Sequence, residues 1–148
     1  MNDLRSKKFD EIEYFSFNGH ECLVKIVDIY DGDTISIIFQ FNQQYYKYRC
    51  RLCRINCEEL HSSTSQKTEM ANQSRIELAR KILGEQVDLE CKRNHLRELL
   101  NNHTGLNYCK FYEFDKYGRL LIELYESENT DSPNLNDFLI TQGLASPY

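Results

Sequence analysis

The chain lacks several features that mark specialised classes of protein. It contains no tryptophan, although ten tyrosines and eight phenylalanines supply ample aromatic surface for a β-containing core and for stacking on bases. No stretch approaches the roughly 18–20 continuous apolar residues of a membrane-spanning helix, which predicts no association with a membrane. No apolar run follows the polar N-terminus, so no secretory signal is visible and an intracellular location is favoured over secretion.

An excess of positive charge is also missing. Lys and Arg number 18 against 23 Asp and Glu, for a formal net charge of −5. A protein that only coats nucleic acid would normally be basic, so this balance weakly disfavours that class. It does not exclude an enzyme that holds one phosphate with a metal ion and a few arginines, because net charge governs solubility and steering rather than the chemistry of a pocket.

The residues that are present suit one globular domain. The 148 residues are 41% hydrophobic and 28% charged, which is enough for a domain with its own core. Without an export signal, the six cysteines are expected to be reduced rather than paired in a disulfide framework. We divide the chain into a polar N-terminal extension, residues 1–20, and a single domain, residues 21–148.

Apolar and polar residues alternate in the first part of this domain. The pattern predicts three strands, over residues 22–30, 34–39 and 45–55. A hairpin turn at Asp31-Gly32 separates the first two, and Gly32 is expected to supply the positive φ of a tight hairpin. A second turn at residues 42–44 leads into the third strand.

Helical periodicity enters in the second half of the chain. After a loop over 57–68, the spacing predicts a helix over 69–83 with Gly84 as its C-cap, a short strand over 87–91 and a short helix over 95–100. Strands follow over 108–114 and 120–125, and then a last helix that runs to Gln142 and is capped by Gly143, with Pro133 in its first turn. This order predicts an α+β, mainly β fold: a five-stranded barrel of the OB type with about three helices packed outside.

Four short motifs each have an ordinary structural explanation when taken alone. Residues 31–34 are first of all a hairpin turn, and the cations between residues 47 and 54 suit a solvated strand edge. Residues 115–119 suit a polar turn, and the carboxylates at 58–59 suit the surface. The order and spacing of the motifs are more specific than any one of them.

Together the motifs resemble the staphylococcal nuclease family. Arg51-Leu-Cys-Arg-Ile-Asn-Cys-Glu-Glu59 is similar to its Arg-Leu-x-x-Ile/Val-Asp-x-Pro-Glu segment, and Asp31-Gly-Asp-Thr34 matches its Asp-Gly-Asp-Thr turn. Asp115-Lys-Tyr-Gly-Arg119 matches the Asp-x-Tyr-Gly-Arg block, and residues 135–145 look like the family's C-terminal helix. The four blocks occur in the family's order across most of residues 22–148, and the family fold is an OB barrel with three helices.

The resemblance implies a metal-dependent endonuclease that hydrolyses phosphodiester bonds of DNA, and of RNA as well, with little base specificity. It implies one bound Ca²⁺, or Mg²⁺ in its place, since both ions prefer oxygen ligands. It also implies a nucleic acid substrate and gives no reason to expect an obligate protein partner, so we expect a monomer. The residues that it implies are Asp33, Asn56 and the main-chain carbonyl of Cys57 for the metal; Arg51, Glu59 as general base, and Arg119 for catalysis; and Lys116 and Tyr117 for the nucleotide.

The chain departs from the family pattern at three places. Asn56 stands where the family has a second carboxylate ligand, so the site loses one negative charge and metal binding is expected to weaken. Glu58 replaces the family's Pro, and residues 92–106 form a longer segment than usual, which we interpret as an added surface helix. The alternative function is therefore a catalytically weakened or inactive module that binds nucleic acid or protein.

Strand geometry adds two expectations. Arg49 and Arg51 lie two residues apart and should share one face, with Arg51 facing the phosphate and Arg49 a supporting or solvated neighbour. Cys50, Cys53, Cys57 and His61 have the spacing of zinc ligands. On a strand over 45–55, however, Cys50 and Cys53 would point to opposite faces, which favours buried thiols over a zinc site.

Overall fold

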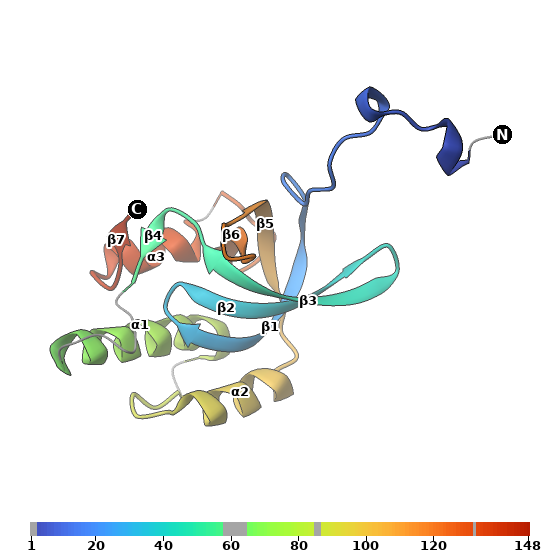
Figure 1. Cartoon of the computed structure of the whole chain (residues 1–148). Coiled ribbons are helices and arrows are strands. Elements are labelled where there is room, and N and C mark those ends of the chain that lie inside the picture. The colour runs from blue at the N-terminus through green and yellow to red at the C-terminus, as the bar shows by residue number, and fades with distance from the viewer. Residues whose placement is uncertain (1–2, 58–64, 85–86, 132) are drawn as a thin grey trace.

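The computed structural model describes residues 3–57, 65–84, 87–131 and 133–148, and for residues 65–67 the backbone alone. Figure 1 shows the elements in chain order. After two short 3₁₀ turns at Leu4–Ser6 and Phe9–Glu11, they are β1 (Glu21–Asp31), β2 (Thr34–Phe41), β3 (Gln44–Leu52), β4 (Ile55–Asn56), α1 (Ser65–Leu83), α2 (Arg93–Asn102), β5 (Asn107–Phe114), β6 (Leu120–Tyr125), α3 (Leu135–Thr141) and β7 (Ser146–Pro147).

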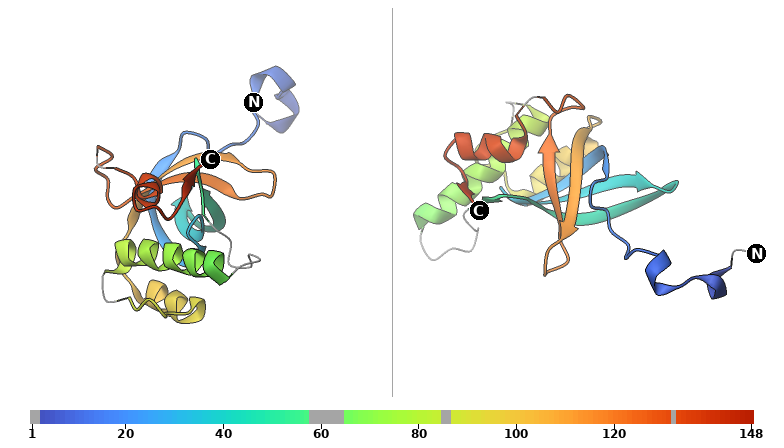
Figure 2. Two further views of the ribbon diagram at one scale, coloured as in Figure 1. Left: turned by 90° about the vertical axis from the view of Figure 1, so that its left-hand side faces the viewer. Right: turned by 90° about the horizontal axis from the view of Figure 1, so that it is seen from above.

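Five strands close into a barrel in the order β1-β2-β3-β6-β5, with β5 pairing back to β1. The β3–β6 pair is parallel and the other pairs are antiparallel. Helices α1 and α2 pack along β1, while α3 packs against β6 on another side (Figure 2). This arrangement confirms the predicted α+β, mainly β fold with an OB-type barrel and three helices outside it.

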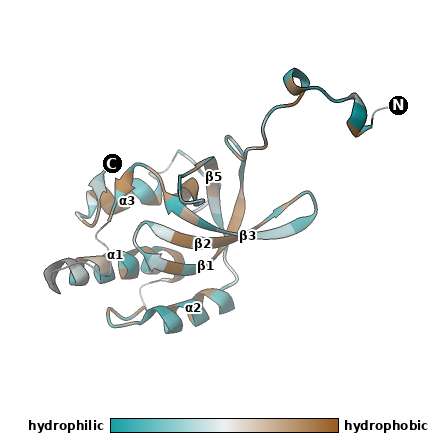
Figure 3. Ribbon diagram, in the orientation of Figure 1, coloured by the Kyte–Doolittle hydropathy of each residue, from teal (hydrophilic) through white to brown (hydrophobic). Residues whose placement is uncertain are grey.

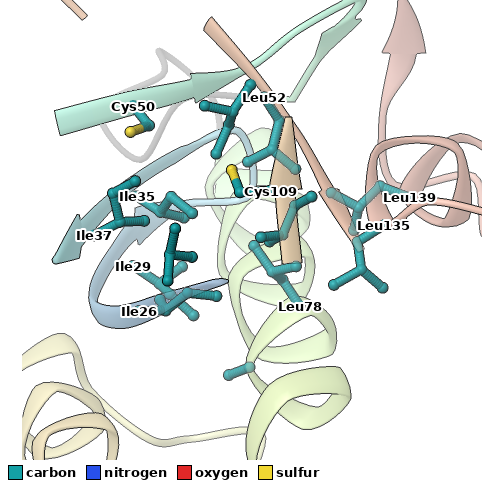
Figure 4. Close-up of a cluster of buried hydrophobic side chains, with 14 of the residues drawn as sticks. Ile26, Ile29, Ile35, Ile37, Cys50, Leu52, Leu78, Cys109, Leu135 and Leu139 are labelled. Carbon is teal, nitrogen blue, oxygen red and sulfur yellow. The ribbon is translucent and has the colours of Figure 1, made fainter. Parts of the chain in front are cut away.

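The barrel interior is filled by the inward positions of its strands. Cys50 and Leu52 of β3, with Ile35 and Ile37 of β2, point into one buried cluster (Figure 4). The strands carry brown, apolar bands, whereas α2 is mostly teal and polar on the face away from the barrel (Figure 3). No helix in the described part of the chain is long and apolar enough to cross a membrane.

The N-terminal segment ends in a residue that belongs to the core. Phe17 is only 4% exposed, and its ring centroid lies 5.2 Å from that of Phe41, 5.5 Å from Phe39 and 6.0 Å from Phe111. The residues before it extend away from the barrel (Figure 1). A domain boundary between residues 20 and 21 stays a prediction, but Phe17 closes one end of the barrel.

The predicted third strand, 45–55, is wrong at its end. Strand β3 stops at Leu52, and a turn at Cys53–Arg54 separates it from β4. Arg54 adopts a φ of 66°, and the Cys53 amide donates to the carbonyl of Ile122. A positive φ is incompatible with an extended strand, so the chain turns out of the barrel here.

The strand predicted over 87–91 is also wrong. These residues form a turn in which the Cys91 amide donates to the carbonyl of Asp88. The apolar side chain of Val87 is buried, but no neighbouring strand pairs with this segment. A short apolar run fits a buried turn as well as a strand, and periodicity alone does not separate them.

Two predicted helix starts are corrected. Helix α1 begins at Ser65, four residues before the predicted start; of the predicted loop over 57–68, residues 58–64 lie outside the described part of the chain. Helix α3 begins at Leu135, because the side chain of Asn134 accepts the Asp137 amide at 2.8 Å and caps the helix. Pro133 therefore precedes the cap instead of lying in the first turn. The predicted helix over 95–100 lies inside α2.

The C-terminal caps are as predicted. Gly84 after α1 has a φ of 113° and Gly143 after α3 a φ of 73°, a region that glycine adopts without steric cost.

The buried Asn136 fixes α3 to the barrel: it accepts the Leu124 amide and donates to the carbonyls of Ile122 and Cys53. Helix α3 thus positions the chain that follows it, including β7, which pairs with β4.

Candidate active site

One open cleft of about 960 Å³ brings together residues from distant parts of the sequence. The β1–β2 turn contributes its carboxylates, the outer face of β3 its basic side chains, and the β5–β6 turn a tyrosine and an arginine. Among the described residues, its lining includes Asp33, Arg51, Asn56, Cys57, Tyr117 and Arg119. Six of the eight predicted site residues therefore meet at one cleft.

The β1–β2 turn depends on glycine for a reason that the sequence prediction missed. Gly32 does not adopt a positive φ, so that expectation was wrong. A Cβ atom at this position would lie 2.6 Å from the Cβ of Ser74 and 2.7 Å from the Sγ of Cys57. The turn is pressed against α1 and the chain after β4, and only a residue without a side chain fits.

This turn holds two carboxylates that are almost fully buried. Asp31 and Asp33 are each 6% exposed, and Oδ1 of Asp31 accepts the Asp33 amide at 3.3 Å. Burial, and next the neighbouring carboxyl group of Asp33, raise the pKa of Asp31 to about 7. Oδ2 of Asp33 accepts the Cys57 amide at 3.0 Å and Oδ1 accepts the Thr34 hydroxyl at 3.2 Å.

Arg51 connects the outer face of β3 to this carboxylate pair. Its Nη2 atom lies 3.6 Å from Oδ2 of Asp33 and donates to the carbonyl of Ile55 at 3.1 Å and to Oδ1 of Asn56 at 3.2 Å. The guanidinium carbon lies 4.9 Å from the ring centroid of Tyr148. The group is thus held from several sides while its residue lines the open cleft.

Arg119 approaches from the β5–β6 turn. Its Nε donates to Oδ2 of Asp115 at 2.8 Å, and its Nη1 donates to the Thr34 hydroxyl at 3.4 Å. Partial burial alone would raise the pKa of Asp115, but the amides of Arg119 and Tyr117 and the guanidinium of Arg119 hold it below its usual value. Asp115 therefore stays ionised and orients the arginine.

Strand pairing explains why the two arginines meet. Thr34 lies opposite Arg51 in the β2–β3 ladder, and Leu120 lies opposite Cys50 in the parallel β3–β6 ladder. Arg119 precedes Leu120, so the parallel pairing brings it beside the end of β3. Two residues that are 68 positions apart thereby reach one cleft.

The remaining predicted residues differ in position. Asn56 is exposed on β4, and Cys57 packs its side chain against Gly32. Tyr117 is 72% exposed at the cleft, whereas Lys116 lies outside the lining and places its Nζ 5.2 Å from the Tyr117 ring centroid.

Glu59, predicted as the general base, lies outside the described residues, as do Glu58 and His61.

The sequence prediction missed several residues at the cleft. Asp31 begins the Asp-Gly-Asp-Thr motif that contains Asp33, and this membership is the sequence signal that could have identified it. Asp115 begins the Asp-Lys-Tyr-Gly-Arg motif and orients its arginine. Tyr148 and Arg93 carry no sequence signal, because strand β7 and helix α2 bring them to the cleft through long-range packing.

The cysteines of the zinc alternative lie in different environments. Cys50 is inside the barrel, where burial raises the pKa of its thiol (Figure 4). Burial, and next the charges of Asp33 and Asp31, raise the pKa of Cys57 to about 12. A zinc ligand must be a thiolate, which these surroundings oppose. Over the described ranges, no group of three or more His, Cys, Asp or Glu side chains is arranged to hold a metal ion.

The oxygen atoms at the cleft nevertheless fit one hard cation. The two buried carboxylates of Asp31 and Asp33 repel one another. Of these two, Asp33 lies near the guanidinium of Arg51, whereas Asp31 forms no ion pair with any described residue. The amide oxygen of Asn56 lies at the same cleft. Carboxylate and amide oxygens are the ligands that Ca²⁺ and Mg²⁺ prefer.

Comparison with protein families bears on this cleft. A family model described as staphylococcal nuclease homologue matches residues 49–148. The matched range begins at Arg49 in β3 and includes Arg51 and Arg119. No curated protein matches the chain.

Proposed function

The chain belongs to the staphylococcal nuclease family, and we propose that it is a metal-dependent endonuclease that hydrolyses phosphodiester bonds of DNA and RNA with little base specificity. The observation that carries the proposal is the meeting of Asp33, Arg51 and Arg119 at one cleft, where Thr34 joins them. Its hydroxyl donates to Asp33 and accepts from Arg119, and Thr34 lies opposite Arg51 in the sheet.

The two arginines bind the scissile phosphate in this proposal. Planar guanidinium groups form bidentate, charge-assisted hydrogen bonds with phosphate oxygens. Arg51 and Arg119 are held by Asn56 and Asp115, so their donors are oriented before the substrate binds. Such preorganised charge stabilises the negative charge that develops on the equatorial oxygens during hydrolysis.

Glu59 acts as the general base that orients and deprotonates the attacking water. It follows β4 by three residues, and the amide of Cys57 in the same segment is bound by Asp33. A carboxylate within hydrogen-bond reach of the water is suited to this task.

Asp33, Asn56 and the main-chain carbonyl of Cys57 hold one Ca²⁺, with Mg²⁺ as a substitute. The pair of buried carboxylates at Asp31 and Asp33 supports a cation here, since an ion would offset their repulsion. When bound, the ion supplies Lewis-acid stabilisation of the phosphoryl oxygens. Asn56 in place of a carboxylate lowers the charge of the ligand set and therefore the affinity for the ion.

Lys116 and Tyr117 contact the nucleotide. Tyr117 is exposed at the cleft and its ring centroid lies 5.5 Å from the guanidinium carbon of Arg119. Stacking of a base on a tyrosine is tolerant of sequence, because every base has a π face. Low base specificity follows, and no step of the proposed reaction needs a second protein chain.

A digestion assay tests the proposal. The protein is incubated with single-stranded DNA or RNA in Ca²⁺, in Mg²⁺ or in chelator, together with the variants Arg119→Gln and Glu59→Ala. We expect cleavage that depends on the metal ion and falls by at least about 100-fold in both variants. Arg97→Gln is the matched control, because Arg97 lies on α2 outside the cleft lining and should retain full cleavage.

Thermal unfolding of each variant separates loss of activity from loss of fold. Equal cleavage by Arg119→Gln and by the unchanged protein would show that the cleft is not the site of the reaction. Cleavage that persists in chelator would show that the reaction does not need a metal ion.

Asn56 favours one alternative, a weakened or inactive module that binds nucleic acid or protein. Its amide oxygen already accepts a hydrogen bond from Arg51, and it adds no charge to a metal site. A binding module would retain oligonucleotides in every buffer and cleave none of them. The digestion assay therefore distinguishes the two functions when it is paired with a binding measurement on the same samples.

A further inference from the structure

The outer face of β3 continues the cleft beyond Arg51. Side chains alternate along the strand, with Cys50 and Leu52 buried in the barrel and Arg49 exposed on the opposite face. Arg51, Arg49 and Lys47 share that outer face, and all three line the cleft. These three cations form what we call the β3 stripe.

Two members of the β3 stripe lack a counter-charge. Arg51 lies near Asp33, but Lys47 and Arg49 form no ion pair with any described residue. Other cations of the chain do have an ion-pair partner, as Arg54 has in Glu123 and Arg93, which lines the same cleft, has in Asp28. Exposed cations on one strand face repel one another weakly, and a bound anion would relieve this repulsion.

The spacing of the β3 stripe suits one ligand class. Residues two apart on a strand are separated by about 6.7 Å. Consecutive phosphates of an extended single strand of nucleic acid have a comparable separation. The chain has a net charge of −5, whereas the β3 stripe beside the proposed phosphate-binding arginines is positively charged.

We propose that Lys47 and Arg49 bind the phosphates that flank the scissile one in a single-stranded nucleic acid. This inference rests on the proposed function, which assigns Arg51 to the scissile phosphate. Ser36 lies opposite Arg49 in the β2–β3 ladder and lines the same cleft, so its hydroxyl adds a neutral donor to this phosphate subsite. Each cation replaces counterions on the backbone and gives affinity without reading sequence.

The β3 stripe ends at an exposed aromatic residue. Tyr45 is 75% exposed and follows the same alternation, at the tip of the β2–β3 hairpin that projects beyond the barrel (Figure 1). The distance along the strand from Tyr45 to Arg51 is roughly 20 Å, which spans about three phosphate spacings. Affinity should therefore rise with substrate length up to about four nucleotides and then level off.

Fluorescence anisotropy of labelled oligothymidylates of two, four, eight and twelve nucleotides, in chelator, tests the inference. We expect the double variant K47Q/R49Q to bind the eight-nucleotide strand about tenfold more weakly, with a slope of log Kd against log salt that is smaller by about 1.4. Its affinity for the dinucleotide, which carries no flanking phosphates, should be unchanged. The control K81Q/K110Q removes two cations outside the cleft lining and should change neither measurement.

Arg49→Lys keeps the charge and should keep the salt slope, and thermal unfolding checks that each variant folds. Equal affinity of K47Q/R49Q and the unchanged protein for the eight-nucleotide strand overturns the inference, even if the protein cleaves DNA. A loss of affinity that is as large for a twelve-base-pair duplex overturns the preference for single strands. If K47Q/R49Q loses affinity for the longer strands only, and the unchanged protein cleaves no nucleic acid, the phosphate-binding role of the β3 stripe is supported and the proposed nuclease function is contradicted.

Discussion

Gly32 lies at the tightest contact of the candidate site. It is flanked by the two buried carboxylates, and a Cβ atom would meet the Cβ of Ser74 at 2.6 Å and the Sγ of Cys57 at 2.7 Å. Neither atom is the end of a long flexible side chain, so the turn or helix α1 would have to shift. The position of Asp33 therefore depends on the absence of a side chain one residue before it.

We expect Gly32→Ala to lower the free energy of unfolding by about 1–3 kcal/mol, because it overpacks a closed contact. The matched control is Gly105→Ala, where the three atoms nearest to the added Cβ all belong to the His103 imidazole, the end of a side chain that can rotate. Chemical denaturation of both variants checks the difference. Equal stability of the two alanine variants would contradict the close approach at Gly32.

Asn56 is the residue on which the metal affinity of the proposed site depends. We expect Asn56→Asp to tighten Ca²⁺ binding, because affinity in such sites increases with the number of ligand charges. Calorimetric titration of the protein with Ca²⁺, without substrate, measures this directly. Asn102→Asp on the exposed face of α2 adds the same charge away from the cleft and is the control. Unchanged Ca²⁺ affinity in Asn56→Asp would remove this position from the ligand set.

At the scale of elements, the added helix α2 is attached to the barrel by an ionic contact. Asp28 of β1 accepts from Arg93 at 2.5 Å and from Arg97 at 3.4 Å, and the Arg93 guanidinium carbon lies 4.7 Å from the Tyr30 ring centroid. Partial burial alone would raise the pKa of Asp28, but the hydrogen bonds and charges of Arg93, and then of Arg97, hold it below its usual value. The prediction of a surface helix within residues 92–106 is confirmed by α2, whereas its being an addition to the family fold stays a prediction. The helix also brings Arg93 to the cleft.

The lowered pKa of Asp28 determines how this contact depends on pH. The folded state binds the proton less tightly than the unfolded state, so ionised Asp28 stabilises the fold above its unfolded pKa of about 3.9 and loses this effect as pH falls through the lower folded pKa. We expect Asp28→Asn to cost about 1–2 kcal/mol at pH 7 and almost nothing near pH 2. Denaturation across this range, with the exposed Asp131→Asn as control, measures it. A difference that is constant with pH would exclude the ionic contribution.

At the scale of the whole molecule, net charge and cleft charge have opposite signs. The chain carries −5, whereas the cleft lining includes five Lys and Arg side chains against two Asp. Lys47 and Arg49 on β3 line the cleft without an ion-pair partner among the described residues, and low-dielectric walls focus their field on an approaching anion. Local charge should therefore determine the response of the reaction to salt.

We expect kcat/KM on single-stranded DNA to fall as the salt concentration rises from about 50 to about 300 mM, because salt screens the attraction of the cleft. A response governed by the net charge of −5 would have the opposite sign, since screening would then relieve repulsion. Initial rates at saturating Ca²⁺ distinguish the two. A kcat/KM that rises with salt would contradict the local attraction.

Much of the fold and part of the site follow from local signals. Alternation predicts the strands of the barrel because side chains on a strand alternate between core and solvent, as Cys50 and Arg49 do. The glycines that follow α1 and α3 predict where these helices end, because a helix often ends in a residue with positive φ and glycine adopts that conformation most readily. The residue types at the cleft follow from motifs at fixed spacing, since the chemistry of a phosphate or a hard cation allows few alternatives.

The tertiary structure alone decides which of these residues meet. The parallel β3–β6 pair brings Arg119 beside Arg51. Strand β7 brings Tyr148, the next residue, to the guanidinium of Arg51. Gly32 is needed because of a contact with α1, 42 residues away, and not because of its own φ. Sequence spacing determines neighbours within a helix or strand, whereas contacts between elements depend on closing long loops, and only the packed core selects which loops close.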